Sequence, residues 1–248
     1  MEDRIQDLPF LQNGKKVKKT GQEKINFSLK HVQPLTSNQK VTFREYNSGK
    51  HLMLHGLPGT GKTFLLLYLA LNQVLNENSP YKKIIIVRSV VPTRNIGFLP
   101  GKPAEKAKIF EGPYNAILTE LFGRGDAYDY LKNKGIIEFM TTSFLRGITL
   151  NDCIIIFDEM QNANFHELDT SITRIGQNCK ILFAGDFGQS DFMYHHENER
   201  NGILQFMRIV KNMRGSSFFF IEFGKEDIVR SDTVKDYIIA KDKLKIAV

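Results

Sequence analysis

Apolar runs of two lengths alternate along the chain after about residue 50. Short runs such as KIIIVR at 83–88 are rich in β-branched residues and apolar at consecutive positions, as strands covered on both faces are. Longer runs such as TFLLLYLALNQVL at 63–75 exceed the length of a strand and predict helices. Strands that alternate with helices predict an α/β fold, in which helices cover both faces of a parallel sheet.

The expected elements follow from these two patterns. Strands are expected at 51–55, 83–88, 136–140, 153–157, 180–184 and 217–223. Helices are expected at 63–75, 113–122, 127–133, 165–175, 202–213 and from about 232. Ligands of open parallel sheets bind at the carboxyl ends of the strands, so the loops that leave those ends are the places to look for chemistry.

One such loop has the composition of a phosphate-binding loop. GLPGTGKT at 56–63 matches G-x-x-x-x-G-K-[ST] in full, between an expected strand and an expected helix. Glycines allow successive backbone N–H groups to face one anion, and the following helix directs its positive dipole end at the same point. The plain alternative is a glycine-rich turn. The residues expected to bind the nucleotide here are Gly56, Pro58, Gly59, Thr60, Gly61, Lys62, Thr63 and Phe64.

Two adjacent carboxylates follow another expected strand. In CIIIFDEMQ at 153–161, Asp158 stands where it can hold the water shell of Mg²⁺, and Glu159 can orient and deprotonate water. Gln161 is a candidate sensor of the γ-phosphate. Such a pair is also common as surface capping, but its order after a phosphate loop favours catalysis. Gln189, in GDFGQSD after the next strand, is a second candidate γ-phosphate contact.

Together these motifs resemble the PhoH family, P-loop ATPases that are similar to the first RecA-like domain of superfamily 1 helicases. The resemblance covers the chain from about residue 33, which leaves residues 1–32 as a basic N-terminal extension and 33–248 as the ATPase domain. It rests on PLTSNQ (34–39), GLPGTGKT (56–63), GFLPGKPAEK (97–106), FLRGITL (144–150), DEMQN (158–162), TRIG (173–176), GDFGQSD (185–191) and DIVRSD (227–232).

The resemblance implies a role for each matching residue. It implies ATP binding by Lys62 and Thr63, with Mg²⁺ as the second cofactor, held with the help of Asp158. It implies water activation by Glu159, and γ-phosphate contacts by Gln161 and Gln189. One position departs from the family's pattern, because Ser89 follows Arg88 where a proline is expected.

Two further residues carry roles only through the resemblance. Gln39 matches the glutamine that reads the adenine edge in related helicases, and its plain alternative is a solvent-facing helix residue. Arg230 matches an arginine that acts as a finger on the γ-phosphate, and its plain alternative is a surface partner of Asp227 or Asp232. The guanine-reading Asn/Thr-Lys-x-Asp signature is absent after the phosphate loop, which favours ATP over GTP.

The length of the chain shapes the expected mechanism. Only about 64 residues follow Ala184, too few for a second RecA-like domain that would close over the nucleotide. We therefore expect a homo-oligomer in which Arg230 of one subunit reaches the ATP of the next through a head-to-tail contact. The family resemblance suggests a ring of six.

Composition and charge add limits on partners. No apolar stretch approaches about 18 residues and no signal peptide is evident, so we expect a cytoplasmic protein without a membrane partner. Cys153 and Cys179 lack ligand spacing and are interpreted as reduced core residues. His195 and His196 are interpreted as surface residues. A net charge of +7, with KKVKK at 15–19, allows nucleic acid as a partner; the basic tail is either a solvated end or a phosphate-tracking arm.

Three functions remain open at this point. The first is an ATPase that remodels or unwinds nucleic acid, with RNA favoured, for which Arg146, Thr141 and Thr142 are candidate backbone contacts. The second is a small-molecule kinase, although no arginine-rich lid is evident. The third is a nucleotide-dependent protein-interaction module with weak turnover.

Overall fold

The computed structural model describes residues 28–89, 103–186, 197–215 and 217–244. Within these residues the strands form one six-stranded sheet in the order β3-β2-β4-β5-β1-β6, and every neighbouring pair is parallel. The strands are β1 (His51–Gly56), β2 (Lys83–Arg88), β3 (Ile137–Thr141), β4 (Cys153–Asp158), β5 (Cys179–Ala184) and β6 (Phe218–Phe223). The predicted parallel sheet is therefore confirmed, and each strand lies within one residue of its expected bounds.

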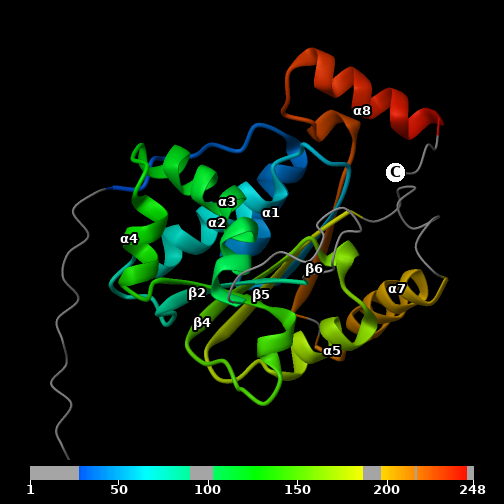
Figure 1. The fold of residues 1–248 in the computed structure, drawn as a ribbon. Helices are drawn as coiled ribbons and strands as arrows, with labels where there is room; N and C mark the ends of the chain where they lie inside the picture. Colours follow the sequence, from blue (N-terminus) through cyan, green and yellow to red (C-terminus); the bar gives the residue numbers. More distant parts are fainter. Residues whose placement is uncertain (1–27, 90–102, 187–196, 216, 245–248) are drawn as a thin grey trace, which may run out of the picture.

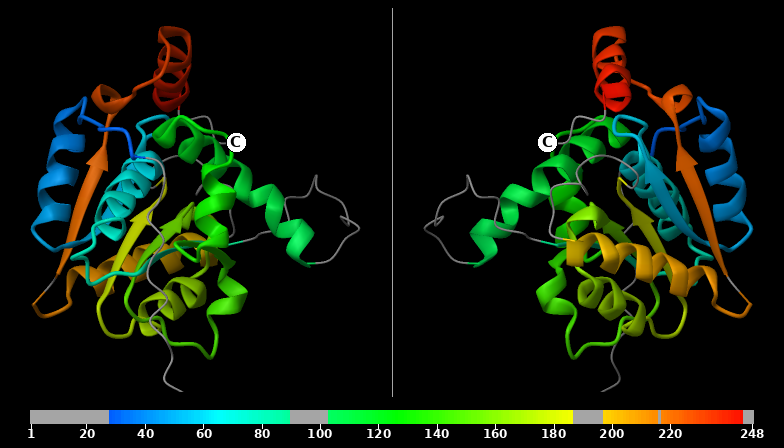
Figure 2. Two further views of the ribbon diagram at one scale, coloured as in Figure 1. Left: turned by 90° about the vertical axis from the view of Figure 1, so that its left-hand side faces the viewer. Right: turned by 90° about the vertical axis from the view of Figure 1, so that its right-hand side faces the viewer.

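Helices cover both faces of the sheet (Figure 1). One face carries α1 (Ser37–Asn47), α2 (Lys62–Val74), α3 (Pro103–Phe122) and α4 (Ala127–Asn133), and the other carries α5 (Phe165–Thr173) and α7 (Glu197–Lys211). Figure 2 shows α8 (Asp232–Leu244) standing beyond the carboxyl end of β6, and none of its residues is buried. Short 3-10 turns complete the set: η1 (Thr142–Leu145), η2 (Met160–Asn162) and η3 (Lys225–Asp227).

The sheet separates two apolar cores. In β2, Ile84 and Ile86 pack under α2 and α3, whereas Ile85 and Val87 pack against the side of α5 and α7. All four side chains are fully buried. This double covering explains why the strands are apolar at consecutive positions.

Three helices differ from the expectation. α3 begins at Pro103, ten residues before the expected start at 113, because Pro113 lies inside the helix and does not begin it. α7 begins at Glu197, earlier than expected. α1 was not among the helices expected from the apolar pattern, since its buried face consists of Gln39, Thr42 and Tyr46, which give no apolar period.

The two cysteines lie opposite each other in neighbouring strands. Cys153 of β4 pairs in register with Cys179 of β5, and their sulfur atoms are 3.6 Å apart. Both are free thiols; Cys153 is buried and Cys179 partly so. Burial raises the pKa of Cys153 far above its ordinary value, which keeps this thiol protonated.

Among the described helices, none is long and apolar enough to cross a membrane.

Candidate nucleotide-binding site

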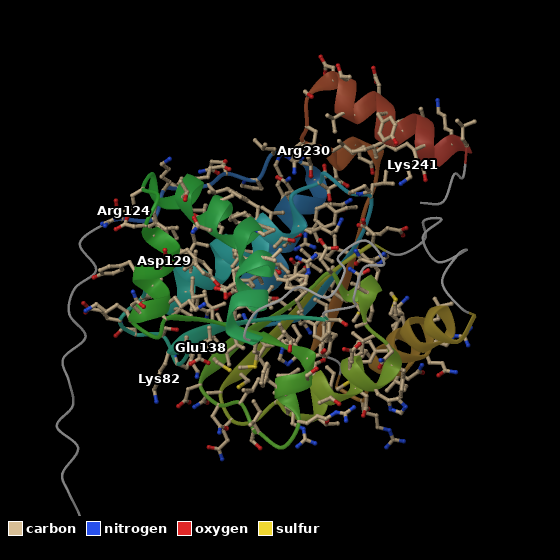
Figure 3. The ribbon with its side chains drawn as sticks, viewed as in Figure 1. Lys82, Arg124, Asp129, Glu138, Arg230 and Lys241 are labelled. Atoms are coloured by element: carbon tan, nitrogen blue, oxygen red, sulfur yellow. The ribbon has the colours of Figure 1, made fainter. Side chains whose placement is uncertain are left out.

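Three neighbouring strand ends meet at the carboxyl edge of the sheet. β1 leads into the phosphate loop, β4 ends at Asp158, and β5, which lies between them, leads to Gly185 and Asp186. Figure 3 marks this edge by Arg230, while Lys82, just before β2, lies at the opposite edge. Parallel pairing thus brings together segments that are far apart in the sequence, such as those of Leu52 and Leu182.

The phosphate loop needs its glycines for backbone reasons. Gly56 has a φ of +116°, and a Cβ there would lie 2.2 Å from the Phe223 carbonyl oxygen of β6. Gly61, with a φ of +82°, forms the N-cap of α2. No other residue adopts these conformations without strain. The shape of the loop therefore depends on its backbone conformation, as the shape of an anion nest does.

The Lys62 amine is held inside this loop. It donates to the carbonyl oxygens of Gly56 at 3.1 Å and Leu57 at 2.7 Å, and it lies 3.0 Å from Asp186 Oδ1. The residue is only 8% exposed. A bound phosphate would have to take the place of some of these partners.

Thr63 and Asp158 meet beside the loop. The Thr63 hydroxyl donates to Asp158 Oδ1 at 2.8 Å, and the Tyr114 hydroxyl donates to Oδ2 at 2.9 Å. Burial, followed by the nearby Glu159 charge, raises the pKa of Asp158, and the bonds from Thr63 and Tyr114 oppose this shift. Hydroxyl and carboxylate oxygens are ligands that Mg²⁺ prefers. Among the described residues no group of three or more His, Cys, Asp or Glu could hold a metal, so a magnesium ion here would need phosphate oxygens and water as well.

Glu159 and Gln161 follow Asp158 toward the end of β5. Glu159 has a φ of +53°, a left-handed conformation that is uncommon for this residue type and that clusters at functional sites. Gln161 Nε2 donates to Glu159 Oε2 at 2.5 Å, and the Asp186 backbone N–H donates to Gln161 Oε1 at 3.1 Å. Gln161 therefore joins the ends of β4 and β5. Gln189 lies outside the described residues.

Gln39 is buried, not solvent-facing. It is 3% exposed on α1, where its Oε1 accepts from the Leu35 backbone N–H at 2.7 Å. Its Nε2 donates to the Thr60 carbonyl oxygen of the phosphate loop at 3.2 Å. The side chain is thus fixed against the loop by its amide, which retains one N–H and one acceptor site for a base.

A carboxylate that we expected only as a surface partner of Arg230, Asp227, connects several segments of this region. Asp227 is fully buried and accepts from Thr36 Oγ1 at 2.5 Å, from Asn38 Nδ2 at 2.7 Å and from the Gly224 N–H at 2.9 Å. It therefore fixes the start of α1 and cannot serve as a surface partner of Arg230. The T-x-x-Q spacing at 36–39, a capping-box pattern, was the available signal for the start of this helix.

Arg230 lies against the phosphate loop of its own chain (Figure 3). The Val229 N–H donates to the Gly59 carbonyl oxygen at 3.0 Å. A Cβ at Gly59 would lie 3.0 Å from Arg230 Cγ and 3.3 Å from Ile238 Cδ1 of α8. The segment after β6 therefore covers the loop within a single chain.

A family model described as PhoH-like protein matches residues 31–241. The chain belongs to the PhoH family. A PhoH-like protein of Bacillus subtilis (strain 168) is 33% identical over 189 residues, which cover 76% of this chain and 57% of that protein. Protein PhoH2 of the same strain is 38% identical over 145 residues, 57% of this chain and 33% of that protein. The chain thus spans little more than half the length of the first relative.

Two solved structures align with most of this chain and with about half of their own length. The large terminase of a thermophilic bacteriophage in complex with ADP aligns over 82% of this chain and 49% of that chain, at 12% identity and a TM-score of 0.44. The Sulfolobus solfataricus SWI2/SNF2 ATPase core in complex with dsDNA aligns over 79% and 46%, at 12% identity and a TM-score of 0.43. The PhoH family, the parallel sheet and the loop between β1 and α2 confirm the predicted P-loop fold.

Ser89, where the resemblance to the family leads us to expect a proline, has hydrogen-bond partners on α5. Ser89 is buried, and its hydroxyl donates to both carboxylate oxygens of Glu167, at 3.0 and 3.1 Å. Thr142 is buried as well and also donates to Glu167. The Thr142 hydroxyl is thus committed to the fold and is not free for a nucleic-acid contact, whereas Arg146 is exposed and Thr141 half-buried.

The remaining candidates lie in or just after the phosphate loop and at the end of β2. Pro58 is exposed at the tip of the loop, and Phe64 is half-buried against the core under α2. Arg88 ends β2 opposite Asp158, and its guanidinium lies 5.7 Å from the Phe110 ring of α3. His195 and His196 lie outside the described residues.

Proposed function

We propose that this PhoH-family chain binds ATP with Mg²⁺ and hydrolyses it. The observation that carries the proposal is the convergence of Lys62, Thr63, Asp158 and Glu159 at one edge of the sheet, with Thr63 and Asp158 joined at 2.8 Å. A structural turn would not need a buried lysine, a buried carboxylate and a left-handed glutamate at the same place.

The phosphates and the metal have separate ligands in this proposal. The backbone N–H groups of the loop and the Lys62 amine bind the β- and γ-phosphates. Thr63 and Asp158 hold Mg²⁺, which when bound neutralises charge on these phosphates. The chemistry of the side chains supports this division, because Thr63 and Asp158 offer oxygen ligands to Mg²⁺ and Lys62 offers a positive charge to the phosphates.

Water activation falls to Glu159. Its carboxylate accepts the proton of the attacking water, and Gln161 holds it in place through the bond at 2.5 Å. Because Gln161 also binds the Asp186 N–H, it is suited to respond to the γ-phosphate at the ends of β4 and β5. Gln189 is proposed as a second γ-phosphate contact.

Base recognition and charge stabilisation involve segments outside the loop. Gln39 is proposed to read the adenine edge with the free capacity of its amide. Arg230 is proposed to stabilise charge on the γ-phosphate. Its position against Gly59 of its own chain supports a role at its own nucleotide that needs no neighbour. The alternative contact, in which Arg230 of one subunit reaches the nucleotide of the next, and the hexameric ring built on it remain predictions, which the solution mass with and without nucleotide tests.

We further propose that hydrolysis is coupled to binding or remodelling of single-stranded nucleic acid, with RNA favoured. At the carboxyl end of β3, η1 presents Phe144, 63% exposed, and the exposed Arg146 follows it. An aromatic ring stacks on bases and an arginine binds phosphate, which is the combination that proteins use to bind single-stranded nucleic acid. The net charge of +7 is consistent with such a partner.

The test is ATP turnover with and without a single-stranded RNA, for the wild type and for Glu159→Gln. Turnover that rises with RNA and disappears in Glu159→Gln supports the proposal. Arg146→Ala is the companion variant, expected to weaken RNA stimulation while RNA-independent turnover stays unchanged. Nucleotide binding without turnover in any condition would favour an interaction module, and ADP release that requires a small-molecule acceptor would favour a kinase.

A further inference from the structure

α3 contributes a residue to the candidate site that no sequence motif identified. Tyr114, fully buried in the turn after Pro113, donates its hydroxyl to Asp158 Oδ2 at 2.9 Å. Thr63 donates to the other carboxylate oxygen, Oδ1, at 2.8 Å. Each oxygen of Asp158 therefore has one fixed donor, one from α2 beside the phosphate loop and one from α3.

The Tyr114 ring is held in a single position. Its centroid lies 5.9 Å from that of Phe139 on β3, and the residue is 0% exposed within the core formed by α2, α3 and α4. α3 touches the same edge again through Phe110, whose ring lies 5.7 Å from the Arg88 guanidinium. A hydroxyl on a ring so confined is a preorganised donor and not an adaptable one.

A carboxylate as buried as Asp158 depends on such donors. Asp158 is 4% exposed, so water cannot orient its oxygens from the side of α3. A buried acceptor without a donor costs roughly 1–3 kcal/mol, and more when it is charged. Partners that orient a metal ligand from behind also set how well the ligand binds the ion.

We propose that Tyr114 is a positioning residue for the magnesium-nucleotide site: its hydroxyl holds the Asp158 carboxylate beside the Thr63 hydroxyl. The inference rests on the proposed binding of magnesium and nucleotide, and it adds α3 to the magnesium site as a third element after α2 and β4. Tyr114 touches neither the phosphates nor the water; it acts through Asp158.

The experiment measures how strongly Mg²⁺ tightens nucleotide binding. A fluorescent methylanthraniloyl derivative of ADP is titrated in excess Mg²⁺ and in EDTA, and the ratio of the two dissociation constants gives the magnesium effect. In Tyr114→Phe this effect is expected to fall roughly 10-fold, within the range of about 10–100-fold that is usual for groups orienting a metal ligand. The affinity in EDTA is expected to stay within about twofold, because the backbone of the loop is untouched.

Tyr128→Phe is the matched control. Tyr128 of α4 is also a buried tyrosine on the same side of the sheet, and its hydroxyl also donates to a carboxylate, Glu111 Oε2 of α3 at 2.7 Å. Glu111 has no part in the proposed site. Tyr128→Phe is expected to lose about as much stability as Tyr114→Phe and to keep the wild-type magnesium effect. Equal magnesium effects in wild type and Tyr114→Phe, or equal losses in both tyrosine variants, would overturn the proposal.

A double variant covers the case in which Tyr114→Phe does not fold. With Asp158→Asn no buried charge is left without a donor, so Tyr114→Phe is added to that background and compared with Asp158→Asn alone. The proposal requires equal magnesium effects, since Tyr114 acts only through the carboxylate. A further loss overturns it. A wild-type protein that binds no nucleotide in Mg²⁺ would overturn the proposed function as well, whereas a responsive wild type with an unchanged Tyr114→Phe overturns this inference alone.

Discussion

Lys62 Nζ lies 3.0 Å from Asp186 Oδ1, although the two residues follow different strands, β1 and β5. The amine also donates to the carbonyl oxygens of Gly56 and Leu57. Without a nucleotide, the positive charge of the loop is therefore satisfied by the protein itself. A triphosphate competes with Asp186 for this amine, so the contribution of Lys62 to binding is the difference between two sets of partners.

Lys62→Ala is expected to weaken nucleotide binding by at least about 10-fold, since the positively charged amine inside the loop is lost and a charge-assisted bond contributes roughly 1.5–3 kcal/mol. The measurement is titration of ADP by calorimetry. Asp186→Asn serves as the opposite change: it removes the competing carboxylate and should bind ADP in EDTA at least as tightly as the wild type. Equal affinity of Lys62→Ala and wild type would contradict the assignment of the loop.

Glu159→Gln is expected to bind ATP with nearly wild-type affinity and to lose at least about 100-fold in turnover, because an amide cannot accept the proton of water. The replacement keeps the shape of the side chain in its left-handed backbone position. Phosphate release in single-turnover and steady-state assays measures the effect. Glu138→Gln, a change in the surface ion pair with Lys83, is the control and should hydrolyse ATP normally. A Glu159→Gln enzyme as fast as the wild type would assign the base elsewhere.

Site residues that lie in contiguous motifs could be predicted from the sequence, whereas contacts between residues far apart in the sequence could not. The phosphate loop and the Asp158–Glu159 pair are contiguous, and the strands before them are continuous apolar runs, so both the fold and these residues were predictable. Tyr114 binds Asp158 across 44 positions, and Thr36 binds Asp227 across 191. Tyr114 has no motif of its own, and the motifs PLTSNQ and DIVRSD, which contain Thr36 and Asp227, do not show that these two residues meet.

Gln39 provides a test of base recognition at the level of single atoms. A glutamine amide pairs with adenine by donating to N7 and accepting from N6, so removal of N7 should cost the wild type affinity. We expect 7-deaza-ATP to bind the wild type about 5- to 10-fold more weakly than ATP, which corresponds to one hydrogen bond of about 1 kcal/mol. Gln39→Glu keeps the oxygen that accepts from Leu35 but loses the N–H donor, and it should bind the two nucleotides alike. If Gln39→Glu still discriminates between them, another group reads N7.

His51 makes stability depend on pH at the other edge of the sheet. Burial, and then the nearby Lys180 charge, lowers the pKa of His51 from an ordinary value of 6.5 to about 4, and the Ile181 N–H donates to its Nδ1 at 3.1 Å. Between these two pH values the unfolded chain binds a proton that the folded protein does not bind. The free energy of unfolding is therefore undiminished above pH 6.5 and falls as the pH drops toward 4, by on the order of 3 kcal/mol in total.

Urea unfolding of the wild type and His51→Asn at a series of pH values between 7 and 4.5 checks this dependence. Asparagine retains an acceptor for the Ile181 N–H but does not titrate, so the loss of stability on acidification should be smaller in His51→Asn. His166→Asn is the control, because His166 is exposed on α5. Its free energy of unfolding should fall with pH as steeply as that of the wild type. If His51→Asn loses stability as steeply as the wild type, acid sensitivity originates in other groups, since only a residue that binds a proton on unfolding can contribute to the slope.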